Sequence, residues 1–479
     1  MSRLNRENLR SAWLILIACS SLSIVVAAMA ALNTALADIA IDIGADTGQM
    51  TWIIDGYTLA LAALLLPAGA IGDRLGRRGV LIFGLVAFAL ASLAAIWTTS
   101  PTQLICTRVL AGAAAAAIMP TTLSLITSGV PADKRSLGVS IWAAVAGAGA
   151  IAGFFVTGVL LEFFSWHSIF ITFAGSAGMA ALLCLTIGSS KDADPQRFDF
   201  LGSLVSVLAV TGVVFGLLEA PQRGWASPLV LATLIGGLLL AVVFCVIELR
   251  VTHPLLDVRL FTNRAFGAGS LSVLLQFFAT FSAFYLLLQR LQLVFGFSPL
   301  RSAFALLPMV VGVSVFALIG NWLAVRYHSL RFVLSGGILI SSAGLLLVGL
   351  IDYDDYPMMA WMLGVVAIGI GLTSAPSTTA IMANTPLDNQ GIGSAVNDTA
   401  REIGAAIGIA LAGSLLATGY ASRIGTTAEY ARTQLAAAGA QRIALGDTVG
   451  GHTLIAQAGV AATHISRSLA EATAVANQL

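Results

Sequence analysis

The sequence predicts an all-α membrane protein in which many apolar helices cross a bilayer. Of its 479 residues, 58% are hydrophobic and only 10% are charged, and the mean hydropathy is +0.93. A soluble globular protein carries about 25% charged residues. The apolar residues also fall into repeated runs of about 20, each long enough to cross roughly 30 Å of hydrocarbon as a helix. These observations exclude a water-soluble globule, and the net charge of +1 gives no bias toward nucleic acid.

Thirteen membrane spans are predicted from the apolar runs and from the polar segments that separate them. The first run follows a basic N-terminus and is too long for the apolar segment of a signal peptide, so we interpret it as the first span. The predicted spans cover residues 12–36, 50–72, 79–98, 102–127, 136–161, 166–188, 200–219, 227–248, 265–289, 303–325, 331–351, 357–382 and 391–418.

Two polar segments, residues 188–199 and 250–264, divide the chain into three parts. We expect a six-span N-terminal bundle over residues 1–190 and a central insertion of two spans with its linkers over residues 191–262. Residues 263–479 should form a C-terminal bundle with five visible spans and an outer tail. A second bundle of six helices would be one helix short, so we expect that a fourteenth span is missing from this chain.

The distribution of Lys and Arg predicts that the N-terminus lies in the cytoplasm. With this orientation, fifteen of the 24 basic residues fall in cytoplasmic segments and seven in outer segments. The opposite orientation would invert this bias and so violate the tendency of basic residues to remain in the cytoplasm. We therefore expect a multi-pass protein of the plasma (inner) membrane.

No metal or cofactor site is predicted. The four cysteines all fall inside apolar runs and are interpreted as free thiols, and the five histidines show no metal-ligand spacing. The chain also has no paired His/Asp or Ser/His constellation near a membrane face, which argues against a lipid-modifying enzyme.

The most specific pattern is GAIGDRLGRR, at the turn between the second and third predicted spans. It places glycines around one acid, Asp73, which is followed by Arg74 and Arg77. Glycine allows a tight turn between packed helices, and a carboxylate can accept hydrogen bonds at a helix end. A basic cytoplasmic turn alone would explain the arginines, which can face anionic headgroups. It would not explain the glycines, which include Gly69 and Gly76.

This block resembles the cytoplasmic loop motif of the major facilitator superfamily, and other segments support the resemblance. LICTRVLAGAAAA, which contains Arg108, is similar to the fourth-span motif, and GAGAIAGFFVTG is similar to the glycine-rich fifth-span motif of antiporters. The two extra central spans and the segments RLQLVFGFSPLRSAFALLP and GIGSAVNDTAREIGAAIGIA resemble the fourteen-span drug:proton antiporter family. The likeness covers nearly the whole chain and ends before that family's last span.

The resemblance implies two six-helix bundles that rock around a central site and export small amphipathic compounds, such as drugs and dyes, in exchange for protons. It also implies that Asp73 acts as a conformational latch and does not itself carry the proton. We expect Gly69, Arg74, Gly76 and Arg77 to belong to this gate.

Three positions depart from the family pattern. Ala28 stands where the family usually has an acid in the first span, and Ala37 replaces a proline. Phe154 stands where the antiporter motif has a proline. A usual proton site is therefore missing and a helix kink should be weaker, so altered or absent proton coupling is an alternative.

Charged residues within the spans are candidates for proton coupling, because an unpaired buried charge is costly. Arg108 lies roughly 9 Å deep in the fourth span at 1.5 Å per residue, and Asp55 is the acid nearest to it in depth. Three interpretations remain open: a structural Asp55–Arg108 pair, a proton-coupled pair, and an interfacial Asp55 without such a role.

The segment NDTARE in the last predicted span places Asp398, Arg401 and Glu402 on one helical face. One arginine can neutralise only one carboxylate, so we expect the surplus acid to take up a proton easily. This pattern predicts proton coupling through Asp398 and Glu402, with Arg401 tuning them. A static triad at the cytoplasmic end is the alternative.

A drug-like cargo needs an apolar, aromatic cavity with few polar anchors. Residue type and position within the spans select six candidates, although any one of them is more often a packing residue. They are Asn33, Tyr57, Trp142, Phe281, Tyr285 and Gln292. Arg290, near the outer end of its span, would favour an anionic or zwitterionic cargo.

The sequence thus predicts a secondary-active exporter and not an enzyme. Its expected partners are a small-molecule substrate, protons and membrane lipids, and the protein is expected to be a monomer. The alternative transporter is an exporter of an endogenous lipid or metabolite with altered or no proton coupling.

Overall fold

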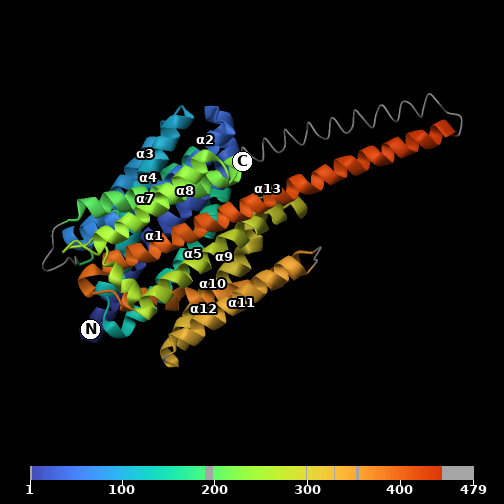
Figure 1. Cartoon of the computed structure of the whole chain (residues 1–479). Helices are drawn as coiled ribbons and strands as arrows, with labels where there is room; N and C mark the ends of the chain where they lie inside the picture. Colours follow the sequence, from blue (N-terminus) through green and yellow to red (C-terminus); the bar gives the residue numbers. More distant parts are fainter. Residues whose placement is uncertain (1–2, 189–197, 298, 328, 352–354, 445–479) are drawn as a thin grey trace.

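The computed structural model describes residues 3–188, 198–297, 299–327, 329–351 and 355–444, and within them it is almost entirely helical (Figure 1). These residues form thirteen α-helices, joined in part by short 3-10 and π turns. The helices are α1 (Arg3–Ile43), α2 (Thr47–Leu75), α3 (Arg77–Ile96), α4 (Pro101–Gly129), α5 (Ala132–Phe163), α6 (His167–Cys184), α7 (Phe200–Arg223), α8 (Pro228–Glu248), α9 (Arg264–Gln289), α10 (Pro299–Arg326), α11 (Leu330–Leu350), α12 (Tyr356–Ala383) and α13 (Gln390–Ala444). The turns are η1 (Val258–Thr262), η2 (Arg290–Val294) and η3 (Leu387–Asn389).

The predicted all-α membrane fold is confirmed. Twelve helical segments of the described residues are long and apolar enough to cross a membrane, and α5 contains the shorter apolar segment Gly153–Phe163. Each of the thirteen predicted spans corresponds to one helix. Such helices satisfy their backbone hydrogen bonds internally, as hydrocarbon requires.

The helices lie side by side in an elongated bundle from which α13 projects (Figure 1). α13 contains 55 residues, so at 1.5 Å per residue it is roughly 80 Å long, more than a bilayer requires. Its apolar part belongs to the segment Leu387–Leu416. The remainder continues as helix beyond the other helices.

Contacts between the early and late helices run along the length of the bundle. α2 and α4 both pack against α13, and α5 packs against α10 and α12. The central pair α7 and α8 pack against each other, and α7 also contacts α2 and α13. Helix α13 therefore touches both the early helices and the central pair.

Small residues bring α1 and α5 into close contact. A Cβ added at Gly153 would lie 2.7 Å from the Cα atom of Ala27, and one at Gly149 would lie 3.0 Å from the Cβ atom of Val26. Backbones approach this closely in membranes only where side chains are small. The glycine-rich segment of the fifth span thus serves helix packing, and α5 runs through Phe154 as one continuous helix.

Candidate functional site

Asp73, near the end of α2, binds the start of α13. Its Oδ1 atom accepts hydrogen bonds from the backbone N–H of Gly391 at 2.9 Å and from Arg77 Nε at 2.8 Å, and its Oδ2 atom accepts one from the N–H of Ile392 at 3.1 Å. The N–H groups of Gly391 and Ile392 belong to the first turn of α13, where free amides and the helix dipole favour a carboxylate. Asp73 therefore joins two helices that are more than 300 residues apart in sequence.

Arg77 completes this contact from the first turn of α3. It forms a salt bridge with Asp73, with Nη2 and Oδ1 2.7 Å apart. Its Nη2 atom also donates to the carbonyl oxygens of Leu387 at 3.0 Å and Asp388 at 3.3 Å. We call Asp73, Arg77 and the backbone of residues 387–392 the latch.

Two glycines make the latch possible. A Cβ at Gly69 would lie 2.5 Å from the carbonyl oxygen of Gly391 and 2.8 Å from the Cβ atom of Ala395, so α2 and α13 touch backbone to backbone. Gly76 has a φ of +105°, a conformation that residues with a Cβ rarely adopt. Arg74 points elsewhere, with its guanidinium 5.4 Å from the ring centre of Phe198.

Asp398, Arg401 and Glu402 are all buried on α13, with exposures of 0%, 2% and 4%. The Arg401 guanidinium lies over two aromatic rings, 4.5 Å from the centre of Trp142 and 4.9 Å from that of Phe277. The expected neutralisation of one carboxylate by direct pairing is not seen, because the ion pairs of the described residues do not include this arginine. The contacts of its guanidinium with these two rings are cation–π contacts.

Polar atoms in this α13 cluster lack partners. Asp398 Oδ1 accepts a hydrogen bond from Asn397 at 3.1 Å, and Arg401 Nη2 donates weakly to Thr378 at 3.5 Å. Asp398 Oδ2, Glu402 Oε2 and the Nε and Nη1 atoms of Arg401 have no hydrogen-bond partner among the described residues. Burying a charged group without a partner is costly.

Arg108 does not pair with Asp55. Its Nε atom donates to the carbonyl oxygen of Ile53 at 3.1 Å, its Nη2 atom donates to that of Ala28 at 3.0 Å, and its guanidinium lies 4.3 Å from the ring centre of Tyr57. The expected pair is therefore absent from this conformation. Two helix carbonyls and one aromatic face satisfy the buried cation instead.

Asp55 lies on α2, which packs against α7, the helix that carries the buried acid Glu219. Glu219 is 7% exposed and forms a salt bridge with Arg223. The sequence interpretation did not select Glu219. The available signal was an acid within a predicted span, four residues before an arginine.

The predicted substrate-cavity residues are distributed over several helices. Tyr57 donates to the carbonyl oxygen of Val25 at 3.0 Å and Trp142 donates to Thr122 at 3.0 Å, so both hydroxyl and indole groups serve helix packing. Phe281 stacks on the neighbouring Phe277. Three further candidates are partly buried or exposed: Asn33, Tyr285 and Gln292.

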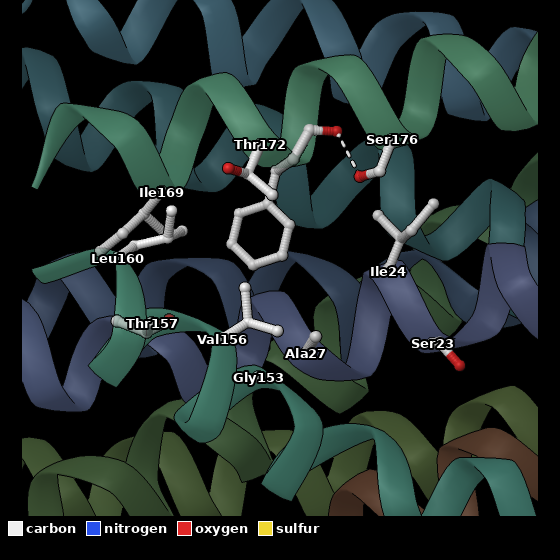
Figure 2. A pocket seen from close by; sticks show the side chains of 11 residues that line it. Ser23, Ile24, Ala27, Gly153, Val156, Thr157, Leu160, Ile169, Thr172 and Ser176 are labelled. Carbon is white, nitrogen blue, oxygen red and sulfur yellow. Dashed lines mark hydrogen bonds between the residues drawn. The ribbon is translucent and has the colours of Figure 1, made fainter. Parts of the chain in front are cut away.

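A cavity of about 190 Å³ lies between α1, α5 and α6. Figure 2 shows its lining, in which Ile24, Val156 and Leu160 present apolar side chains and the hydroxyl of Ser176 donates to the carbonyl oxygen of Phe173. None of the predicted substrate-cavity residues lines it. Its hydroxyl groups on α6 are engaged by backbone carbonyls, so the cavity offers little beyond apolar surface.

Comparisons with known proteins identify the relatives of the chain. The family model described as Major Facilitator Superfamily matches residues 18–409. The chain is 32% identical to the methyl viologen resistance protein SmvA of Salmonella typhimurium over 82% of this chain and 80% of that protein. It is 32% identical to the methylenomycin A resistance protein of Bacillus subtilis, over 81% and 84% of the two chains. The multidrug efflux pump LfrA of Mycolicibacterium smegmatis is 31% identical, over 89% and 85%.

Solved structures share the fold. The proton:xylose symporter XylE superposes with a TM-score of 0.57 at 13% identity, covering 96% of both chains. The human organic anion transporter MFSD10 superposes with a TM-score of 0.56 at 14% identity, covering 85% of this chain and 93% of that chain.

Proposed function

Because the chain belongs to the major facilitator superfamily, we propose that it exports small amphipathic compounds, such as drugs and dyes, across the plasma membrane by proton antiport. It is a membrane transporter and not an enzyme. The resistance and efflux proteins similar to it support drugs and dyes as cargo.

The observation that carries proton coupling is the α13 cluster. Asp398 and Glu402 are buried carboxyl groups without a direct ion pair, and a polar oxygen of each lacks a partner among the described residues. Such groups exchange between a neutral and a charged form when the access of water changes. Arg401 lies between aromatic rings and supplies one positive charge. It therefore limits whether Asp398 and Glu402 can be ionised at the same time.

The latch opens and closes as the two bundles move against each other during transport. We place helices α1–α6 in one moving bundle and α9–α13 in the other, with the latch on the cytoplasmic side and the N-terminus in the cytoplasm. Asp73 then closes the cytoplasmic end in this conformation, because it joins one bundle to the other. When the latch opens, that end becomes accessible to cargo.

The aromatic residues around Arg401 are buried or partly buried between helices in this conformation, and they form the proposed cargo surface when the latch opens. Trp142 and Phe277 flank the guanidinium, and Phe281 stacks on Phe277. An aromatic surface next to buried carboxyl groups suits amphipathic compounds.

Dye efflux from cells tests this function. Cells that express the chain should expel a dye, and a protonophore should stop them. Glu402→Gln and Asp398→Asn should each abolish efflux, while Glu162→Gln, which changes an exposed acid of α5, should leave it unchanged. Efflux that survives both the protonophore and the α13 substitutions would reject proton antiport.

A second candidate is export of an endogenous lipid or metabolite with altered or no proton coupling. The observation in its favour is that Arg108 binds the backbone carbonyl of Ala28, at the position where the family usually has an acid. Absence of dye efflux together with accumulation of a cellular lipid or metabolite in a deletion strain would favour this candidate.

A further inference from the structure

A second pair of carboxyl groups lies outside the α13 cluster, where the central helices join the rest of the chain. Asp199 directly precedes α7, and its Oδ1 atom accepts a hydrogen bond from the N–H of Gly202 at 2.7 Å. Glu248 is the last residue of α8 and is 1% exposed. Because α7 and α8 pack antiparallel along each other, the start of one meets the end of the other.

The second carboxyl oxygen of Asp199 and one carboxyl oxygen of Glu248 lie beside the same residue, Gly202. A Cβ added at Gly202 would collide with both Asp199 Oδ2 and Glu248 Oε1, so these two oxygens lie close to each other. Both oxygens are buried and have no hydrogen-bond partner among the described residues. Glu248 Oε2 is already engaged by the N–H of Leu256 at 3.1 Å.

Two ionised carboxylates in this arrangement would only repel each other. A carboxylate has no proton to donate, so two buried carboxyl oxygens that lie this close without a partner need a proton or a cation between them. The described ion pairs do not include either carboxyl group. A single proton is the smallest occupant that satisfies both oxygens.

Among the residues that the structure describes, no charged group of a neighbouring element forms an ion pair with Asp199 or Glu248. Arg259 of η1 donates to the carbonyl oxygen of Leu249 at 3.3 Å, and Asp257 accepts from the N–H of Arg259 at 3.0 Å. Arg74 of α2 lies over the ring of Phe198. The other ionisable residues of the linker after α8 are exposed: Arg250 and His253.

We propose that Asp199 and Glu248 bind and share one proton, at a site separate from Asp398 and Glu402. The protonated carboxyl group donates to the other carboxylate, and the pair carries one negative charge instead of two. The shared proton thereby links the start of α7 to the end of α8 and to the linker that follows α8.

This site lies next to the latch. Leu255 and Leu256 of the linker are buried in one cluster with Ala70 of α2 and Ala395 of α13. Ala70 is three residues before Asp73, and Ala395 contacts Gly69. Release of the proton would loosen the linker against the same two helices that the latch joins, so the site would sense pH at the latch end of the bundle.

Infrared spectroscopy of the purified full chain in lipid nanodiscs detects the proton directly. We expect the wild-type spectrum at neutral pH to contain a protonated-carboxyl C=O band that is missing from Glu248→Gln. Asp257→Asn, which alters a half-buried linker acid outside the pair, should retain this band. A spectrum of Glu248→Gln that keeps the full band would overturn the proposal.

Thermal unfolding as a function of pH gives a second test that does not depend on transport. The folded protein keeps a proton that the unfolded chain releases, so the unfolding midpoint should fall as pH rises through the release. Glu248→Gln should flatten this dependence because its carboxamide donates to Asp199 at any pH, whereas Asp257→Asn should keep the wild-type slope. Parallel curves for wild type and Glu248→Gln, or a midpoint that follows Na⁺ or Ca²⁺ concentration instead of pH, would contradict a shared proton.

Discussion

At the residue scale, Arg108 and Arg401, the arginines buried within α4 and α13, are stabilised by groups that a sequence pattern does not reveal. Arg108 and Arg401 were correctly placed within spans, but neither takes a carboxylate partner at ion-pair distance. Each guanidinium lies over an aromatic ring, Tyr57 for Arg108 and Trp142 for Arg401. The depth of each arginine in the membrane follows from counting residues along its helix. Which aromatic ring faces its guanidinium depends on how the helices are rotated against each other.

The Tyr57 ring should stabilise the protein through Arg108. A desolvated cation–π contact contributes about 2 kcal/mol, so Tyr57→Leu should lower the thermal unfolding midpoint clearly. Tyr57→Phe, which keeps the ring and removes only the hydroxyl bonded to Val25, should lower it less. Equal losses in the two variants would mean that the hydroxyl group, and not the ring, matters.

The contact between Gly69 and Gly391 leaves no room for a side chain. Gly69→Ala places a methyl group against backbone and Ala395, and such overpacking costs roughly 1–3 kcal/mol. We expect lower thermal stability and slower dye efflux. Gly79→Ala is the matched control, because nothing lies within 4 Å of its added Cβ. A Gly69→Ala protein as stable and active as Gly79→Ala would show that the helices separate easily here.

At the element scale, the sequence was sufficient for the helices and insufficient for their partners. Each apolar run forms its own backbone hydrogen bonds in a membrane, so thirteen helices could be located without knowledge of their packing. The extension of α13 to Ala444 was not predicted, because the polar segment after residue 418 was interpreted only as a tail. Its alanines favour helix. Glu219 was missed because only the packing of α7 on α2 brings it near Asp55.

The start of α13 should lose protection when Asp73 is removed. The amides of Gly391 and Ile392 donate to the Asp73 carboxylate, so Asp73→Ala should accelerate their hydrogen exchange. Asp46→Ala removes a cap of α2 that binds Gln49, and it should leave exchange at residues 391 and 392 unchanged. Unaltered exchange in Asp73→Ala would show that other contacts hold this end closed.

At the scale of the whole molecule, α13 connects the latch with the acids that we propose for proton coupling. Its first turn contributes the backbone of the latch, and its buried acids follow within three turns, with Asp398 roughly 10 Å beyond Gly391. Because a helix transmits displacement along its axis, a change of protonation at Asp398 or Glu402 can alter the hydrogen bonds to Asp73. Because position 28 carries an alanine and not an acid, we propose that coupling depends on α13.

Proton flux in proteoliposomes tests this central claim most directly. The purified chain would be reconstituted with a pH-sensitive dye inside the vesicles, and an imposed pH gradient would be followed after addition of a transported drug. We predict that the drug accelerates collapse of the gradient with the wild-type protein and with Glu162→Gln. No acceleration should occur with the double variant Asp398→Asn, Glu402→Gln. Drug-dependent proton flux that persists in the double variant would contradict coupling through α13.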